Sequence, residues 1–232
     1  MDPREMMKRR ASEKAVEHVE SGFIVGLGSG TTATLAIRLI GERLRAGILR
    51  DILGVPTSLQ AAQEAISSGI PLTTLDEHPE IDVTIDGADQ IDHELRAIKG
   101  GGGALLREKV VASSSRLRIV VADETKLTER LGVGCPVPVE VHPFAIKPVY
   151  MRLLKMGAKP RIRTGTGKLG PVVTDNGNLI IDVSFNALSD PKRLEESLKA
   201  IPGVLETGLF IDLIDLAYIG TREDVRRLGR VG

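Results

Sequence analysis

The sequence predicts an α/β fold, in which an open parallel sheet with helices on both faces is followed by a smaller lobe of helices and strands. Three observations indicate this. Short apolar runs alternate with amphipathic stretches as far as residue 122. Glycine turns precede two of the amphipathic stretches. Beyond residue 131, prolines and a hairpin signal replace the alternation.

The first part of the chain is expected to alternate between helix and strand. An opening helix is expected over residues 5–20, where Ala11, Ala15, Val16 and Val19 lie near one face. The elements expected after it are a strand at 23–27, a helix from 31 to about 45, a strand at 52–55, a helix at 59–67, a strand at 81–85, a helix at 104–112 and a strand at 117–122. Strands separated by helices imply a parallel sheet that is covered on both faces.

After about residue 131 the pattern changes. Prolines crowd one short stretch, which suggests a crossover between layers or domains. They are Pro136, Pro138, Pro143 and Pro148. The elements expected beyond them are a helix at 145–156, a hairpin that turns at 175–177 and returns over 179–183, and a helix at 191–200.

The segment from 203 to 220 is strand-like and could rejoin the first sheet. With that return, residues 1–131 and 205–232 are expected to form the larger domain, and residues 132–204 a small α+β lobe. The chain has 232 residues, of which 42% are apolar, so it can build a core of this size.

The composition narrows the classes of ligand. The 31 basic and 31 acidic residues give a formal net charge of zero, so the chain offers no general attraction for nucleic acid or an anionic membrane. Any phosphate must therefore bind at a local site. The single Cys135 excludes an internal disulfide and multi-cysteine metal centres, and the four histidines show no ligand spacing. No bound metal is expected.

The sequence also indicates in which compartment of the cell the protein is expected. Apolar windows fall short of the roughly 20 residues that span a bilayer. The first ten residues are charged, and no apolar signal-peptide core follows them. A soluble, cytoplasmic protein is expected.

The first motif joins an expected strand to an expected helix and reads Gly-Leu-Gly-Ser-Gly-Thr-Thr-Ala over residues 26–33. Glycines let backbone amides approach a ligand, the start of a helix attracts anions, and Ser29, Thr31 and Thr32 add hydroxyl donors. Thr31 stands where a dinucleotide fingerprint needs its third glycine, and no Gly-Lys-Ser/Thr follows as in a Walker loop. The motif indicates an anion site, with a capped tight turn as the alternative.

The second motif, Asp86-Gly87-Ala88-Asp89, directly follows the expected strand at 81–85. Ligands of an open parallel sheet bind at the carboxyl ends of its strands. Two carboxylates placed there can orient hydroxyls, move protons or hold a metal. The alternative is an Asx-type turn, in which the aspartates only cap the backbone.

The third motif is Lys99 followed by four glycines, residues 100–103, and then by Glu108 just over a turn into a helix. Four glycines are costly in backbone entropy, so a loop that wraps a small polar ligand explains them better than a simple connector. Lys99 supplies a point charge for a phosphate or an oxyanion. Glu108 can reach a ligand held at the loop, or it lies on a solvated helix face. Lys126, just after the strand at 117–122, is either on the ligand side of the sheet or an ordinary surface lysine.

Together these segments resemble the ribose-5-phosphate isomerase A family, and the resemblance runs over nearly the whole chain. The combination of Asp-Gly-Ala-Asp at 86–89, Lys-Gly-Gly-Gly at 99–102 and Arg-Glu-Lys at 107–109 is highly specific. Further matching segments are 138–141, 170–178, 201–204 and 208–210. Ser29 stands where related sequences often carry threonine, but it keeps a hydroxyl.

The resemblance implies a Rossmann-like domain with a ferredoxin-like lobe, usually in a homodimer or homotetramer. It also implies an enzyme of the pentose phosphate pathway that needs no cofactor, with Glu108 as the proton acceptor. The residues that match the family's substrate site are Ser29, Gly30, Thr31, Thr32, Asp86, Gly87, Ala88, Asp89, Lys99, Gly100, Gly101, Gly102 and Lys126.

The implied reaction interconverts ribose 5-phosphate and ribulose 5-phosphate through an enediolate, which requires a base and an electrophile. Glu108 is expected to be the base, with a pKa raised by partial desolvation. Lys99 is expected to stabilise the oxyanion or to contact phosphate. Asp86 and Asp89 are expected to bind sugar hydroxyls, and one of them to assist ring opening. The expected phosphate contacts are the loop 29–32 and Lys126.

Two other classes of function remain open. A non-catalytic sugar-phosphate sensor would normally carry a DNA-binding module, for which residues 1–22 are too short. A related enzyme would be an amino-sugar phosphate deaminase or a coenzyme A transferase. Conversion of ribose 5-phosphate without ammonia, thioester or cofactor separates the isomerase from all of these.

Overall fold

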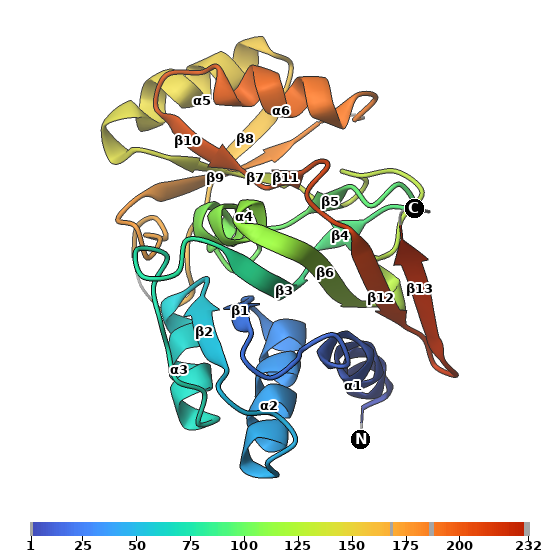
Figure 1. Cartoon of the computed structure of the whole chain (residues 1–232). Coiled ribbons are helices and arrows are strands. Elements are labelled where there is room, and N and C mark those ends of the chain that lie inside the picture. Colours follow the sequence, from blue (N-terminus) through green and yellow to red (C-terminus); the bar gives the residue numbers. More distant parts are fainter. Residues whose placement is uncertain (1, 168, 186–187, 230–232) are drawn as a thin grey trace.

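The computed structural model describes residues 2–167, 169–185 and 188–229. Its largest sheet has six strands in the order β13-β12-β6-β3-β1-β2 (Figure 1). These strands are β1 (Ile24–Leu27), β2 (Leu53–Pro56), β3 (Ile81–Gly87), β6 (Ser115–Asp123), β12 (Leu216–Gly220) and β13 (Val225–Gly229). The neighbouring pairs from β2 to β12 are parallel, and the edge strand β13 pairs antiparallel. The expected parallel sheet is confirmed.

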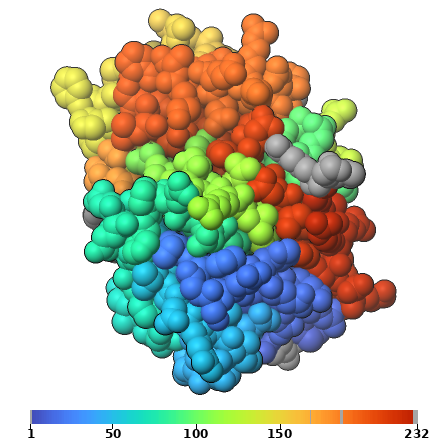
Figure 2. Space-filling model, viewed as in Figure 1, coloured from blue at the N-terminus to red at the C-terminus, as the bar shows by residue number. Residues whose placement is uncertain are grey.

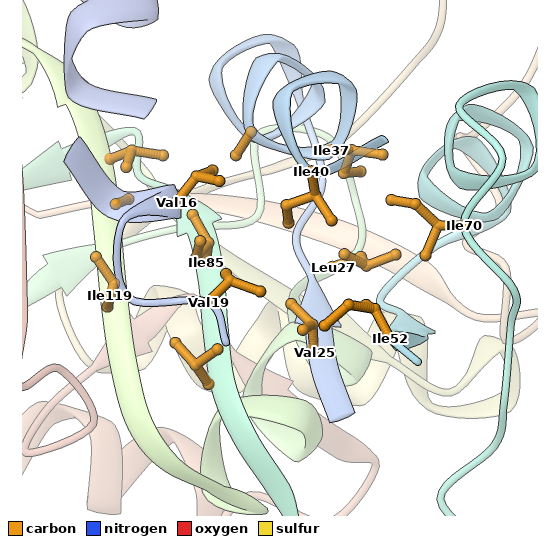
Figure 3. Packing of buried hydrophobic residues seen from close by; sticks show 14 of the residues in the cluster. Val16, Val19, Val25, Leu27, Ile37, Ile40, Ile52, Ile70, Ile85 and Ile119 are labelled. Carbon is orange, nitrogen blue, oxygen red and sulfur yellow. The ribbon is translucent and has the colours of Figure 1, made fainter. Parts of the chain in front are cut away.

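Helices cover both faces of this sheet. α1 (Pro3–Val16), α2 (Thr31–Arg45) and α3 (Leu59–Ser67) lie on one face, and α4 (Leu105–Ser113) lies on the other (Figure 1). The buried side chains of α2 recur at the spacing with which a helix packs one face against a sheet. Figure 3 shows two of them, Ile37 and Ile40, packed among Val25, Leu27 and Ile85 of the strands.

The first helix differs from its expected range of 5–20. It begins at Pro3, because Asp2 caps the amide of Arg4 and proline suits the first helical position. It ends at Val16, so Val19 is buried outside the helix. α1 packs against β6, β12 and β13, which brings the N-terminal helix beside the C-terminal strands (Figure 2).

A second sheet of four antiparallel strands lies on the α4 side, in the order β10-β7-β9-β8. Its strands are β7 (Val137–Val141), β8 (Lys159–Ile162), β9 (Leu179–Ser184) and β10 (Val204–Thr207). α5 (Ile146–Lys155) follows β7, α6 (Pro191–Lys199) follows β9, and both cover the outer face (Figure 1). This βαββαβ order is the ferredoxin-like topology. None of the helices in the described ranges has the length and apolar character of a membrane span.

The expected return of segment 203–220 to the first sheet is correct only for its last part. The segment divides into β10 in the second sheet, β11 (Leu209–Phe210), and β12 in the first sheet, parallel to β6. β11 forms a small third sheet with β5 (Ala97–Ile98), and β5 pairs with β4 (Gln90–Ile91). Two-residue strands are too short to show a period of two, so the sequence did not predict them.

Pro138 lies inside β7, between β10 and β9, although proline cannot donate a hydrogen bond to a neighbouring strand. Its carbonyl accepts from the Gly208 amide at 2.7 Å, just beyond the last β10 pairing, Thr207 opposite Val139. The backbone nitrogen of Pro138, which carries no hydrogen, faces the same side as this carbonyl, beyond the last residue pair between β7 and β10. The proline-rich stretch therefore contains a fully buried strand as well as the crossover.

The expected turn at 175–177 is present. The Thr174 amide donates to the Asn178 carbonyl at 2.8 Å, and Val173 bridges to Leu179. This bridge is short, however, and β9 pairs mainly with β7 and β8. The return strand is thus a central strand of the second sheet.

Candidate active site

The strand order of the parallel sheet places a crevice between β1 and β3. In the spatial order β2-β1-β3-β6-β12, β2 is added on one side of β1, and β3 and the later strands are added on the other side. Ligands of such sheets bind at the carboxyl ends of the two strands where this direction reverses, here β1 and β3. β1 ends one residue before Gly28, and Asp86 lies at the end of β3. The first two sequence motifs therefore meet at the reversal.

All three sequence motifs and Lys126 meet at one cavity of about 240 Å³. The expected residues that line it are Ser29, Gly30, Thr31, Thr32, Gly87, Ala88, Asp89, Lys99, Gly100, Gly101, Gly102, Glu108 and Lys126. Asp86 is buried directly behind this lining and bonds to Ser29 and Lys99. Three lining residues were not predicted: Arg4, Lys8 and Asp123.

The first glycine loop folds closely over Asp86. A Cβ at Gly28 would lie 2.2 Å from Asp86 Oδ1 and 2.5 Å from its Cα, so a side chain there would displace the carboxylate. The Ser29 amide donates to the same oxygen at 3.0 Å. The Ser29 hydroxyl bonds to the hydroxyls of Thr57 (2.8 Å) and Ser58 (2.6 Å), which hold it against the start of α3.

The first turn of α2 opens into the cavity. Gly30, with φ of 90°, is its N-cap, and within the described chain no side chain caps this helix start. Thr31 and Thr32, its first two residues, line the cavity. Uncapped amides and the positive end of the helix dipole favour an anion at this place.

Asp86 holds the ammonium of Lys99. Its Oδ1 accepts from the amides of Gly87 (2.7 Å) and Ser29 (3.0 Å), and its Oδ2 lies 3.0 Å from Lys99 Nζ. Lys99 also donates to the carbonyl of Gly87 and lies over the Phe210 ring, 5.3 Å from its centroid. Asp86 and Lys99 are 5% and 4% exposed, so the pair is fixed and screened from solvent.

Burial alone would lower the pKa of Lys99, because it disfavours the charged form. The carboxylates of Asp86 and Glu108 outweigh that effect and raise the pKa above its ordinary value. Lys99 is therefore a permanent cation at the floor of the cavity.

Glu108 lies in the first turn of α4 and is only 5% exposed, so it is not on a solvated helix face. Its Oε2 lies 3.4 Å from Lys99 Nζ and has no hydrogen-bond partner among the described residues. Burial raises the pKa of Glu108 to about 8; Lys99 opposes this shift, and Asp86 and Asp89 add to it. A carboxyl of this kind can exchange a proton near neutral pH.

The four-glycine loop packs against Asp89. The Gly101 amide donates to Asp89 Oδ2 at 2.7 Å, and a Cβ at Gly101 would lie 2.5 Å from Asp89 Oδ1. On the outer side, Arg163 Nη1 donates to the carbonyls of Gly100 (2.8 Å) and Gly101 (3.0 Å). A side chain at position 101 would therefore displace Asp89, and Arg163 fixes the backbone of the loop from its outer side.

The unpredicted residues Arg4 and Lys8 come from α1. Lys8 Nζ donates to Thr31 Oγ1 at 3.0 Å, and Arg4 pairs with Asp123 at 3.5 Å. Their spacing of four residues puts both on one face of α1, but Arg4 precedes the expected helix of 5–20, and only the docking of α1 brings that face to the cavity. With Lys126 they make one end of the cavity cationic.

Among the described residues, no group of three or more histidine, cysteine, aspartate and glutamate side chains is arranged to hold a metal ion. The polar groups of the cavity are instead a fixed cation, a buried carboxyl, hydroxyls and uncapped amides. This set suits a small anionic ligand with hydroxyl groups.

Comparison with known proteins agrees with this geometry. Residues 53–224 match the family model of ribose 5-phosphate isomerase A, also called phosphoriboisomerase A. The ribose-5-phosphate isomerase A of Trichodesmium erythraeum is 48% identical over 219 residues, 94% of this chain and 92% of that protein. The protein of the same name from Methanosarcina acetivorans is 51% identical over 216 residues, 93% of this chain and 91% of that protein.

A solved structure is also similar. It is a D-ribose-5-phosphate isomerase in complex with phospho-erythronic acid, 45% identical to this chain, with a TM-score of 0.96. The match covers 98% of this chain and 99% of that one.

The raised pKa of Glu108 predicts how stability depends on pH. Between the ordinary pKa of 4.5 and about 8, the folded protein keeps a proton on Glu108 that the unfolded chain releases. The free energy of unfolding therefore falls as pH rises through this window. Glu108→Gln does not titrate, so the wild type should lose stability relative to it from about pH 5 to about pH 8 in urea unfolding. A stability difference that is constant over this range would contradict the raised pKa.

Proposed function

Because the chain belongs to the ribose-5-phosphate isomerase A family, we propose that Glu108 is the base with which it interconverts ribose 5-phosphate and ribulose 5-phosphate. The chain is an aldose–ketose isomerase of this family. The reaction moves one proton between adjacent carbons, so it needs a base beside them and a positive group beside the oxygens. Family membership favours this function over the sensor, deaminase and transferase alternatives.

One observation carries the assignment of the base. The Glu108 side chain lines the cavity, and its Oε2 is buried without a hydrogen-bond partner among the described residues, 3.4 Å from the ammonium of Lys99. A carboxylate oxygen with a free lone pair beside a fixed cation is the pair of groups that enediolate chemistry requires. Triosephosphate isomerase likewise pairs a glutamate base with an electrophile.

The steps follow from this placement. In the open-chain aldose, Glu108 removes the proton from C2, and the electron pair of that C–H bond forms the C1–C2 double bond. The carbonyl electrons move to O1, and the resulting oxyanion is stabilised by Lys99. The proton of the C2 hydroxyl then passes to O1, and the C2–O2 electrons form the C2 carbonyl. The electron pair of the C1–C2 double bond takes the proton held by Glu108 at C1, which gives the ketose and returns Glu108 to the carboxylate.

The two aspartates have different roles in this scheme. Both oxygens of Asp86 are bonded, to two amides and to Lys99, so Asp86 orients the cation. Asp89 lines the cavity and is the carboxylate better placed to bind sugar hydroxyls and to assist ring opening.

The phosphate is assigned to the cationic end of the cavity. The first turn of α2, with Thr31 and Thr32, offers amides and hydroxyls, and Lys8, Arg4 and Lys126 offer positive charge. The similar structure is a complex with phospho-erythronic acid, a compound that carries a phosphate and a carboxylate, and this supports a site for a small phosphorylated ligand in the present chain. This placement leaves Lys99 for the reacting oxygens.

The wider setting is proposed from the family. The isomerase acts in the cytoplasm, in the non-oxidative branch of the pentose phosphate pathway, as a homodimer or homotetramer. The expected boundary at 204/205 would divide β10, so residues 132–207 are proposed as the small lobe and residues 1–131 with 208–232 as the catalytic domain.

Glu108→Gln tests the base. Glutamine keeps nearly the same volume, so KM should change little, while kcat should fall by about 10²–10⁴. Exchange of the substrate C2 proton with deuterated solvent, followed by NMR, should fail in step with turnover. Glu80→Gln is the control at an exposed position. If Glu108→Gln folds and keeps more than about a tenth of wild-type kcat, the base must be sought at Asp86 or Asp89.

Thr31→Ala and Thr32→Ala test the phosphate site. Each should weaken binding of phosphorylated substrate by about 0.5–1.5 kcal/mol, the net value of a neutral hydrogen bond. Binding of inorganic phosphate, measured by calorimetry, should weaken in parallel. Thr74→Ala, at an exposed loop, is the control. Unchanged affinity for both ligands would move the phosphate to Lys99 and Lys126.

A further inference from the structure

Two matching segments of the sequence, 138–141 and 170–178, have no place in the mechanism, yet the structure joins them. Glu140, in the middle of β7, is fully buried. Its Oε1 accepts three hydrogen bonds, from the Thr174 hydroxyl (2.8 Å), the Asn176 amide (3.0 Å) and the Asn178 amide (2.9 Å). We call residues 174–176 the Glu140 turn; Asn178 lies just beyond this turn and donates to the same oxygen of Glu140.

A buried carboxyl is a costly way to hold a turn. Glu140 Oε2 has no hydrogen-bond partner among the described residues, and β7 is buried along its whole length. An under-satisfied polar group in a core destabilises the fold, so the structure that it fixes is expected to have another use. The outward contacts of the turn indicate that use.

The Glu140 turn reaches the helix that carries Glu108. Asn176 Oδ1 accepts from Arg107 Nε at 2.7 Å, and the Asp175 carbonyl accepts from Arg107 Nη2 at 3.0 Å. Arg107 directly precedes Glu108 in the first turn of α4. The Arg107 guanidinium is thus held by two acceptors, one at Nε and one at Nη2, and this fixes the rotation of the first turn of α4.

The same turn reaches the wall on the other side of the cavity. Asp175 Oδ2 accepts from the Leu59 amide at 2.8 Å, at the first residue of α3. The N-cap of α3 is Ser58, whose hydroxyl bonds to Ser29. One turn of the small lobe therefore contacts the supports of both Glu108 and the first glycine loop.

We propose that the Glu140 turn is a positioning element of the catalytic site, in which Asn176 and Arg107 set the place of the Glu108 carboxylate. This rests on the proposed role of Glu108 as the base. Asn176 is the central link, because its amide donates to Glu140 and its oxygen accepts from Arg107. A displacement of about 1 Å at a reacting group can cost roughly 10²-fold in rate, so such a support affects turnover more than binding.

Asn178 provides a matched control, because it donates to the same oxygen of Glu140 and no contact to Arg107 or α3 is found for it among the described residues. Asn176→Ala should lower kcat by about tenfold or more, with KM within about twofold. Asn178→Ala should keep kcat within about twofold, even if it unfolds at lower urea concentration. Asn176→Asp keeps the acceptor for Arg107 but cannot donate to Glu140, so it separates the two contacts and should retain more kcat than Asn176→Ala if the link to Arg107 sets turnover. Both alanine variants are assayed well below their unfolding midpoints.

A double-mutant cycle with Arg107→Ala completes the test. If Arg107 and Asn176 act as one unit, the double variant should lose no more kcat than the worse single variant. Two results would overturn the proposal and leave the turn a purely structural role. One is an equal loss of kcat in Asn176→Ala and Asn178→Ala. The other is a double variant whose loss of kcat is the product of the losses in Asn176→Ala and Arg107→Ala. Failure of the base assignment is distinguishable, since it appears in Glu108→Gln alone.

Discussion

The site depends on one buried ammonium, that of Lys99, held between the carboxyls of Asp86 and Glu108 at 3.0 and 3.4 Å. A lysine only 4% exposed would lose its charge without such partners. The cluster requires the end of β3, the four-glycine loop and the first turn of α4 to meet within a few ångströms. This close approach requires glycine at positions 28 and 101. A Cβ at Gly28 would overlap Asp86, and a Cβ at Gly101 would overlap Asp89.

The burial that fixes Lys99 also raises the pKa of Glu108. In water a glutamate is too weak a base for carbon acids, and here burial and the neighbouring aspartates raise the pKa of Glu108. The same surroundings leave Oε2 without a hydrogen bond among the described residues. The surroundings of this carboxyl therefore lower the stability of the fold and make Glu108 a stronger base. The connection between β8 and β9 holds the outer side of the cavity, through Arg163 on the glycine loop and Asn176 on Arg107.

Much of this architecture could be predicted from the sequence, because its signals are local. α2 and α3 have the expected bounds, and strand ends carry the site residues as the parallel sheet requires. Other features depend on tertiary packing. Lys8 meets Thr31 only after α1 docks. Pro138 is tolerated in β7 only because β10 ends beside it. The hydroxyl of Ser29, expected to face a ligand, is bonded to Thr57 and Ser58.

The central claim is that Glu108 is a buried carboxyl whose pKa lies near neutral pH. It can be measured directly by ¹³C NMR of protein labelled at the glutamate side-chain carboxyls, with Glu108→Gln used to assign the resonance. The signal of Glu108 should titrate with a midpoint near 8, well above the other glutamates. A midpoint at the ordinary value of about 4.3 would contradict the account.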